Sequence, residues 1–134
     1  MKFMLDTNIC IYLIKENPPQ VLGKFEQYSV GEIGLSSITV AELQYGVQKS
    51  KFQEQNQTAL QQFLTPLVVA DFDEAAALTY GKIRADLEAR GRPMGALDML
   101  IAAHALSLGV ELVTNDIKGF SEVPALRVNN WVDG

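Results

Sequence analysis

The 134-residue sequence is poor in the residues that build disulfides and zinc sites, with one cysteine, Cys10, and one histidine, His104. A single cysteine cannot form an internal disulfide, and without a second ligand nearby we expect Cys10 to be a small buried hydrophobic residue. No run approaches the ~20 apolar residues of a membrane span. The start of the chain also lacks the cationic segment and apolar core of a signal peptide. These absences predict a cytoplasmic protein.

Positive charge is also scarce. The chain has 11 Lys and Arg residues against 16 Asp and Glu residues, a net charge of -5. This balance argues against nucleic-acid binding by bulk electrostatic attraction, so such a role would need metal ions or a local basic patch. The densest patch lies on the outer face and at the end of a helix predicted before Gly91, and consists of Lys82, Arg84, Arg90 and Arg92. It is either a solvated helix end or a contact for a phosphate backbone.

Apolar runs typical of buried strands alternate with segments of helical periodicity along the chain. We expect strands at residues 2–5, 34–37, 66–70 and 110–114 and a final edge strand near 126–128, with helices between them. The helix after the second strand is expected to be capped by Ser37 or Thr39. This order predicts an α/β fold of one domain, residues 1–134, in which helices cover both sides of a mostly parallel sheet.

Four acidic residues stand where strands end or helices begin. Asp6 follows the first strand and Asp116 the fourth, Glu42 is expected within the first turn or so of a helix, and Asp98 opens the most apolar helix. Alone, each has a structural explanation, since Asp caps helices and Glu is favoured by the helix dipole. Right-handed crossovers between parallel strands nevertheless bring these positions to one carboxyl edge of the sheet, where ligands bind.

Four carboxylates at one edge would repel one another unless a cation compensates them, most of all Asp98, which is expected to be buried. Hard oxygen ligands with open positions suit Mg²⁺ or Mn²⁺ rather than zinc. Such an ion can polarise a phosphoryl oxygen and activate a water, so the predicted reaction class is phosphodiester hydrolysis. His104, six residues after Asp98, is expected to point away from it and to be packed or hydrogen-bonded.

Four spaced motifs together resemble a PIN-domain ribonuclease, specifically a VapC-type toxin of a bacterial type II toxin-antitoxin (VapBC) system. In chain order they read M-L-D-T-N, T-V-A-E-L-Q-Y-G, R-P-M-G-A-L-D-M-L-I-A-A-H-A-L and L-V-T-N-D-I-K-G-F. The resemblance spans the whole chain. It implies a three-layer α/β/α sandwich around a central parallel sheet of four or five strands.

The resemblance also implies roles for individual residues. Asp6 and Asp98 would bind the metal directly, Asp116 would be a third acid of the cluster, and Glu42 would help to hold the metal or orient water. Asn8 and Thr114 would support these acids. Two features depart from or vary within the family pattern: the position of Asp116 is Asn in some such toxins, and Leu97 stands where the family often has a polar residue.

A toxin of this kind resembles endoribonucleases that cleave structured RNA, commonly tRNA or a ribosomal RNA loop, and that a partner antitoxin silences. The antitoxin's C-terminal segment would reach the acidic cleft with an Arg, and RNA would approach along the basic patch, supplemented across a homodimer. Two other classes of function stay open. One is a phosphatase with Asp6 as nucleophile, although Asn8 stands where that chemistry usually has a second Asp. The other is a non-catalytic module whose acids receive a partner's Arg.

Overall fold

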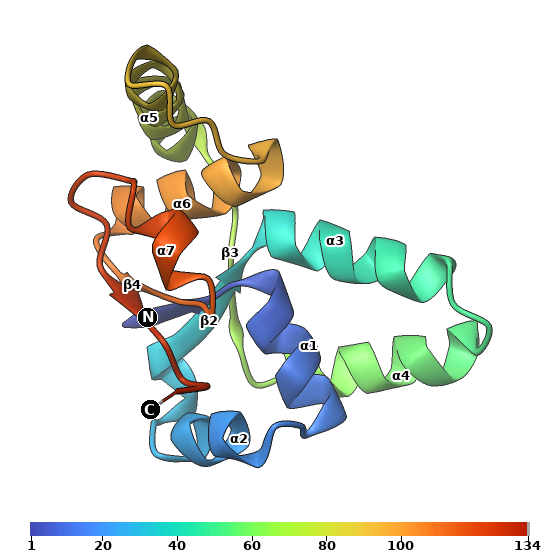
Figure 1. Ribbon diagram of the computed structural model, residues 1–134. Helices are drawn as coiled ribbons and strands as arrows, with labels where there is room; N and C mark the ends of the chain where they lie inside the picture. Colours follow the sequence, from blue (N-terminus) through green and yellow to red (C-terminus); the bar gives the residue numbers. More distant parts are fainter. Residues whose placement is uncertain (134) are drawn as a thin grey trace.

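The centre of the molecule is a parallel β-sheet whose strands are ordered differently in space and in the chain. The computed structural model describes residues 1–133 and gives the spatial order β3-β2-β1-β4-β5, with every neighbouring pair parallel (Figure 1). The strands are β1 (Phe3–Leu5), β2 (Ile33–Ser36), β3 (Val68–Ala70), β4 (Glu111–Val113) and β5 (Val128–Asn129). The predicted parallel sheet is therefore confirmed, with β1 in its middle.

Helices form a layer on each face of this sheet. They are α1 (Thr7–Lys15), α2 (Pro19–Glu26), α3 (Ser37–Gln48), α4 (Gln53–Leu64), α5 (Glu74–Ala89), α6 (Ala96–Leu108) and α7 (Ile117–Phe120), with a 3₁₀ helix at Val30–Glu32. Buried apolar side chains fall into two groups, one drawn from α1 to α4 and the other from α5, α6 and α7. The three-layer α/β/α prediction is confirmed. Within residues 1–133 no helix is long and apolar enough to cross a membrane.

The middle strand is covered on both faces. Phe3 and Leu5 belong to the first apolar group and Met4, between them, to the second. All three are at most 2% exposed. A strand buried in this way has no place for polar side chains, which explains its unbroken apolar run. Because Asp6 is the next residue, the chain delivers a carboxylate directly to the buried centre of the sheet edge.

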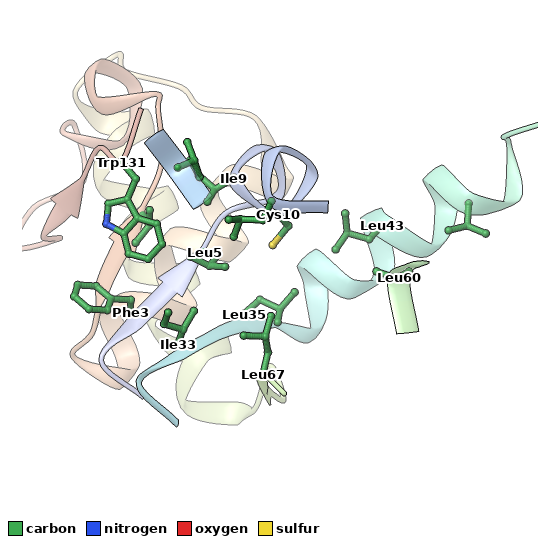
Figure 2. Packing of buried hydrophobic residues seen from close by; sticks show 14 residues of the cluster. Phe3, Leu5, Ile9, Cys10, Ile33, Leu35, Leu43, Leu60, Leu67 and Trp131 are labelled. Atoms are coloured by element: carbon green, nitrogen blue, oxygen red, sulfur yellow. The ribbon is translucent and has the colours of Figure 1, made fainter. Parts of the chain in front are cut away.

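The first apolar group extends from the sheet to the chain's end. Figure 2 shows Phe3, Ile33 and Trp131 around the strands, with Leu43 and Leu60 where α3 meets α4. The ring of Trp131 lies edge-on to Phe3 at a centroid distance of 5.7 Å and stacks on Tyr28 at 5.8 Å. These contacts make Trp131 the aromatic anchor of the C-terminal segment. Cys10 is fully buried in the same group, as predicted.

The second apolar group is built around α6, whose buried residues begin at Met99. His104 lies in this buried stretch, with its Nδ1 2.8 Å from the Ser36 hydroxyl oxygen at the end of β2. Phe72 packs edge-on against its ring at a centroid distance of 5.3 Å. Burial lowers the pKa of His104 below its ordinary value. The expectation of a packed, hydrogen-bonded histidine is confirmed, and His104 joins α6 to the start of α3.

Helix α3 begins earlier than expected. Its cap is Ser36, whose hydroxyl oxygen accepts a hydrogen bond from the Ile38 amide at 3.0 Å, so the prediction of Ser37 or Thr39 as cap is wrong. β2 runs into α3 without a connecting residue, and its last residue, with extended backbone, takes the capping position. Glu42 therefore lies in the second turn, beyond the free amides of the first. α3 and α4 extend side by side away from the sheet (Figure 1).

Candidate metal centre

Asp6 connects the middle strand to the first helix and is 6% exposed. Its Oδ1 accepts a hydrogen bond from the Ile9 amide at 2.9 Å, which makes Asp6 the N-cap of α1. The buried Thr114 hydroxyl donates a second hydrogen bond to the same carboxyl group. Asp6 is therefore a helix cap at the carboxyl edge of the sheet, and two hydrogen bonds hold its carboxyl group.

Burial dominates the electrostatics of Asp6. Loss of water raises the pKa of its carboxyl group from 3.8 to about 6, although hydrogen bonds from Thr114 and Ile9 lower it. The negative charges of Asp98 and Asp116 raise this pKa further. Both acids thus lie near enough to repel the charge on Asp6, and three of the four predicted acids meet at one site.

Asp116 is held to the same edge through Thr114. The Thr114 hydroxyl oxygen accepts a hydrogen bond from the Asp116 amide at 2.9 Å, so one side chain contacts both acids. Asp116 itself caps α7, with Oδ1 accepting from the Gly119 amide at 3.1 Å. A Cβ at position 119 would lie 2.6 Å from Asp116 Oδ2, so this cap requires glycine. The Asp116 side chain is otherwise exposed.

Asp98 lies in the first turn of α6 and is exposed, so the expectation that it would be buried is wrong. The apolar pattern behind that expectation belongs to the residues from Met99 onward, which pack on α5 and the sheet, whereas Leu97 is 47% exposed. Partial loss of water still raises the pKa of Asp98, and the charges of Asp116 and Glu42 raise it further. All four acids are thereby connected through their charges.

Glu42 reaches the site from the second turn of α3. Its Oε1 accepts a hydrogen bond of 2.6 Å from the Thr7 hydroxyl, at the first residue of α1. The sequence alone did not single out Thr7 for this contact, because the two residues are 35 positions apart. The one signal in the sequence is the position of Thr7, a hydroxyl residue next to the Asp at the end of a strand. Helix capping explains a threonine in that position more simply. Asp6 takes the cap instead, which leaves the Thr7 hydroxyl for Glu42.

Asn8 is exposed, and its side chain makes no hydrogen bond with any residue in the range 1–133. Its supporting role therefore stays a prediction. The amide that does connect α1 with the strand edge is Asn115, whose Nδ2 donates to the Tyr12 hydroxyl at 3.0 Å.

The donor chemistry fits a hard divalent cation. In the described part of the chain, none of the four acids forms an ion pair with Lys, Arg or His, so their charges are uncompensated. No three of the acidic, Cys or His side chains in residues 1–133 are grouped closely enough to surround one ion on their own. Mg²⁺ commonly binds through one or two carboxylates and keeps several waters. An ion bound here would therefore need waters to complete its coordination.

Two hollows adjoin the acids, and each includes one of them in its lining. The first is an apolar groove between α1, α3 and α4; it is lined by Ile11, Ile14, Lys15, Glu42, Leu43, Gly46, Val47, Asn56, Ala59 and Leu60. The second is a hollow between the α5–α6 connection and α7, lined by Arg92, Pro93, Met94, Asp116, Lys118, Gly119 and Glu122. The first hollow is therefore mainly apolar, whereas the second carries two cations and two acids.

The predicted basic patch is exposed, but much of its charge is already paired. Arg84 lies 3.0 Å from Glu88 and Arg90 lies 2.9 Å from Asp86, each one helical turn along α5. Arg92 has only a long contact of 3.9 Å with Glu122, and it alone of the four predicted cations lines the hollow at Asp116. Lys118, which the sequence patterns did not single out, lines the same hollow.

A family model described as the PIN domain matches residues 3–126. The chain is 46% identical over 132 residues to ribonuclease VapC2 of Haemophilus influenzae, covering 98% of this chain and 99% of the relative. It is 44% identical over 131 residues to the tRNA(fMet)-specific endonuclease VapC of Shigella flexneri, with 98% of each chain covered. Among solved structures, DNA-bound VapBC from Salmonella typhimurium matches with a TM-score of 0.93 at 41% identity, again with 98% of each chain covered.

The raised pKa of Asp6 leads to a stability prediction. In the metal-free protein the ionised carboxylate costs stability above pH 6, and the cost disappears as the pH falls through about 6 towards 3.8. Asn keeps the helix cap without the charge. Asp6→Asn should therefore stabilise the metal-free chain by about 2–3 kcal/mol at pH 7.5, shrinking to less than about 1 kcal/mol near pH 4.

Urea unfolding in EDTA, followed by circular dichroism at both pH values, measures this difference. A variant that is no more stable than the wild type at pH 7.5, or whose advantage does not change with pH, would contradict it.

Proposed function

The chain belongs to the VapC ribonucleases of the PIN-domain family, and on that basis we propose that it is the toxin of a VapBC pair that hydrolyses phosphodiester bonds in tRNA with Mg²⁺ or Mn²⁺. It would act in the cytoplasm and be silenced by a VapB-type antitoxin. The observation that carries the proposal is the convergence of Asp6, Glu42, Asp98 and Asp116 on one sheet edge without a compensating side-chain cation.

In this proposal Asp6 and Asp98 bind the metal directly, Asp116 is the third acid of the cluster, and Glu42 helps to hold the metal or orients the attacking water. When bound, the ion supplies a Lewis acid for the phosphoryl oxygen and lowers the pKa of the water. The chain's own contribution is position: Thr114 bonds to the Asp6 carboxyl group and to the Asp116 backbone amide, so it connects both acids to the same edge of the sheet. Asp98 and Asp116 are exposed, so they remain accessible to a large substrate.

The tRNA substrate is proposed from the name of the Shigella flexneri relative and from the second hollow. Arg92 and Lys118 line it next to Asp116, where the phosphates flanking the cleaved bond would lie. In the chain's described residues Lys118 has no ion-pair partner. The same hollow contains Glu122 and Asp116, so phosphate contacts there would come from the Arg92 and Lys118 side chains individually and not from a net positive surface. RNA contacts from Lys82, Arg84 and Arg90 stay predictions. So does the formation of a homodimer.

The antitoxin partner is proposed from the VapBC complexes among the similar structures and from the apolar groove. An amphipathic segment would place apolar side chains between α1, α3 and α4, as helices do in grooves of this kind. Glu42, which lines the groove, would then receive a cation such as Arg from the same segment. A segment in this position would occupy one of the four acids and so block the metal site.

Metal-dependent cleavage tests the central proposal. Purified wild-type chain should cleave tRNA with Mg²⁺ and stop in EDTA, and Asp98→Asn should lower the rate at least about a hundredfold, because loss of a metal ligand exceeds the effect of its supporting partners. Asp98 is exposed, so the variant should keep the wild-type circular dichroism spectrum.

A wild-type chain that leaves tRNA intact under these conditions would favour the non-catalytic module. A phosphate trapped on Asp6 would favour the phosphatase.

The second hollow leads to a prediction on RNA affinity. Arg92→Ala with Lys118→Ala should weaken tRNA binding and reduce the slope of log affinity against log salt by about 1–2, because two phosphate contacts are lost. Lys82→Ala with Arg84→Ala is the matched control. It should have the smaller effect, because Arg84 is already paired with Glu88.

Filter binding over a salt series, with the nuclease inactivated by Asp98→Asn, gives both affinity and slope. Equal slopes for the wild type and the Arg92/Lys118 variant would rule out this hollow as an RNA contact.

The groove leads to a prediction on the antitoxin. Gly46 lines it, and a Cβ at this position would meet nothing within 4 Å, so Gly46→Leu should fill the groove without disturbing the core. Binding of the antitoxin encoded with the chain should weaken at least about tenfold, equivalent to ~1.4 kcal/mol. Gly81→Leu on α5, which is equally uncrowded, should leave affinity unchanged.

Isothermal titration calorimetry of the three proteins measures this comparison. Unaltered affinity in Gly46→Leu would place the antitoxin elsewhere.

A further inference from the structure

The shortest hydrogen bond between side chains at the acid site joins Thr7 and Glu42, at 2.6 Å. It connects the first turn of α1 to the second turn of α3, two helices that leave different strands. We propose that Thr7 is a positioning residue for the nuclease, an inference that rests on the proposed function. The Thr7 hydroxyl fixes the Glu42 carboxylate through Oε1, so that Oε2 faces the metal and the attacking water.

The position of Thr7 in its helix explains why its hydroxyl is available. Inside helices, threonine hydroxyls often bond to the carbonyl four residues earlier. Three other threonines of this chain do so: Thr58 bonds to Glu54 O, Thr65 to Gln61 O and Thr79 to Ala75 O. Thr7 is the first residue of α1, and four residues before it the chain is in β1, so no helical turn precedes it. Its hydroxyl bonds across to α3 instead.

Glu42 is fixed by a side chain from another helix, whereas the other two fixed acids each accept a hydrogen bond from a backbone amide. Asp6 is held by an amide and a hydroxyl, and Asp116 is held by an amide of its own helix. Glu42 is longer and more flexible and lies past the free amides at the start of α3. Within residues 1–133, Thr7 is its one hydrogen-bond donor. Without it, no hydrogen bond among the described residues fixes the rotamer of Glu42.

The contact also leaves Glu42 free to act at the site. Thr7 occupies Oε1, and no described residue donates to Oε2. Glu42 lies close enough to Asp98 for its charge to raise the pKa of Asp98. The unoccupied oxygen is therefore the one available to an ion or water between α3 and α6. Because Thr7 directly follows Asp6, one dipeptide fixes two of the four acids.

A double-mutant cycle tests this role. Thr7→Val removes only the hydroxyl and Thr7→Ser retains it, while Thr79→Val is the control for the same substitution at a hydroxyl bonded within its own helix. The readouts are the Mn²⁺ dissociation constant from electron paramagnetic resonance and the single-turnover rate on tRNA. Thr7→Val should reproduce most of the Glu42→Gln defect, about tenfold or more, in whichever readout Glu42→Gln affects, with Thr7→Ser and Thr79→Val near wild type.

In a Glu42→Gln background, Thr7→Val should cause no further loss, because both changes remove the same function. A neutral Thr7→Val, or losses that add fully, would overturn the proposal. A crystal structure of the metal-free Thr7→Val variant supplies a readout independent of catalysis: Glu42 should be displaced or disordered, and an unmoved carboxylate would also overturn it. If no variant, including the wild type, cleaves tRNA, the proposed function fails, while Mn²⁺ affinity and this crystal structure still decide the role of Thr7.

Discussion

The burial of one carboxylate, Asp6, is the constraint on which the rest of the site depends. Strand β1 lies in the middle of the sheet and is covered on both faces, so the residue that follows it cannot remain in water. Its pKa of about 6 shows how poorly this position suits a negative charge in the absence of a cation. The fold keeps the carboxylate there by giving it the Ile9 amide and the Thr114 hydroxyl. A permanent cost of this kind is expected at functional sites and is hard to explain as structural support.

The four acids differ in how firmly they are held, and the differences follow from their places in the fold. Asp6 is buried, Glu42 is partly buried, and Asp98 and Asp116 are exposed. A fixed inner ligand with more accessible outer ones suits an ion that must remain partly hydrated and admit a polymer. The outer acids also enter at the starts of helices α6 and α7, where backbone amides favour negative charge. The difference in exposure among the four acids therefore follows from where the strands end and the helices begin at this edge of the sheet.

Much of this architecture could be predicted from the sequence because burial leaves a strong local pattern. The unbroken apolar run before Asp6 correctly indicated a buried strand, and the apolar run of α6 correctly indicated a helix packed against the sheet. Contacts between distant segments left no such pattern: the Thr7–Glu42 bond and the pairing of Arg90 with Glu122 depend on how helices pack. The errors have the same origin. Ser36 caps α3 because β2 runs directly into the helix, and Asp98 is exposed because only the later turns of α6 face the core.

The two hollows suggest how one acid site can serve an inhibitor and a substrate with different chemistry. The groove between α1, α3 and α4 contains Glu42, and the hollow between the α5–α6 connection and α7 contains Asp116. A partner in the groove would reach Glu42 without needing the cations of the other hollow. RNA bound at Arg92 and Lys118 would approach Asp116 without needing an apolar surface. In the proposed function the two ligands thus meet only at the acids, where the partner's cation and the metal would compete for the same negative charge.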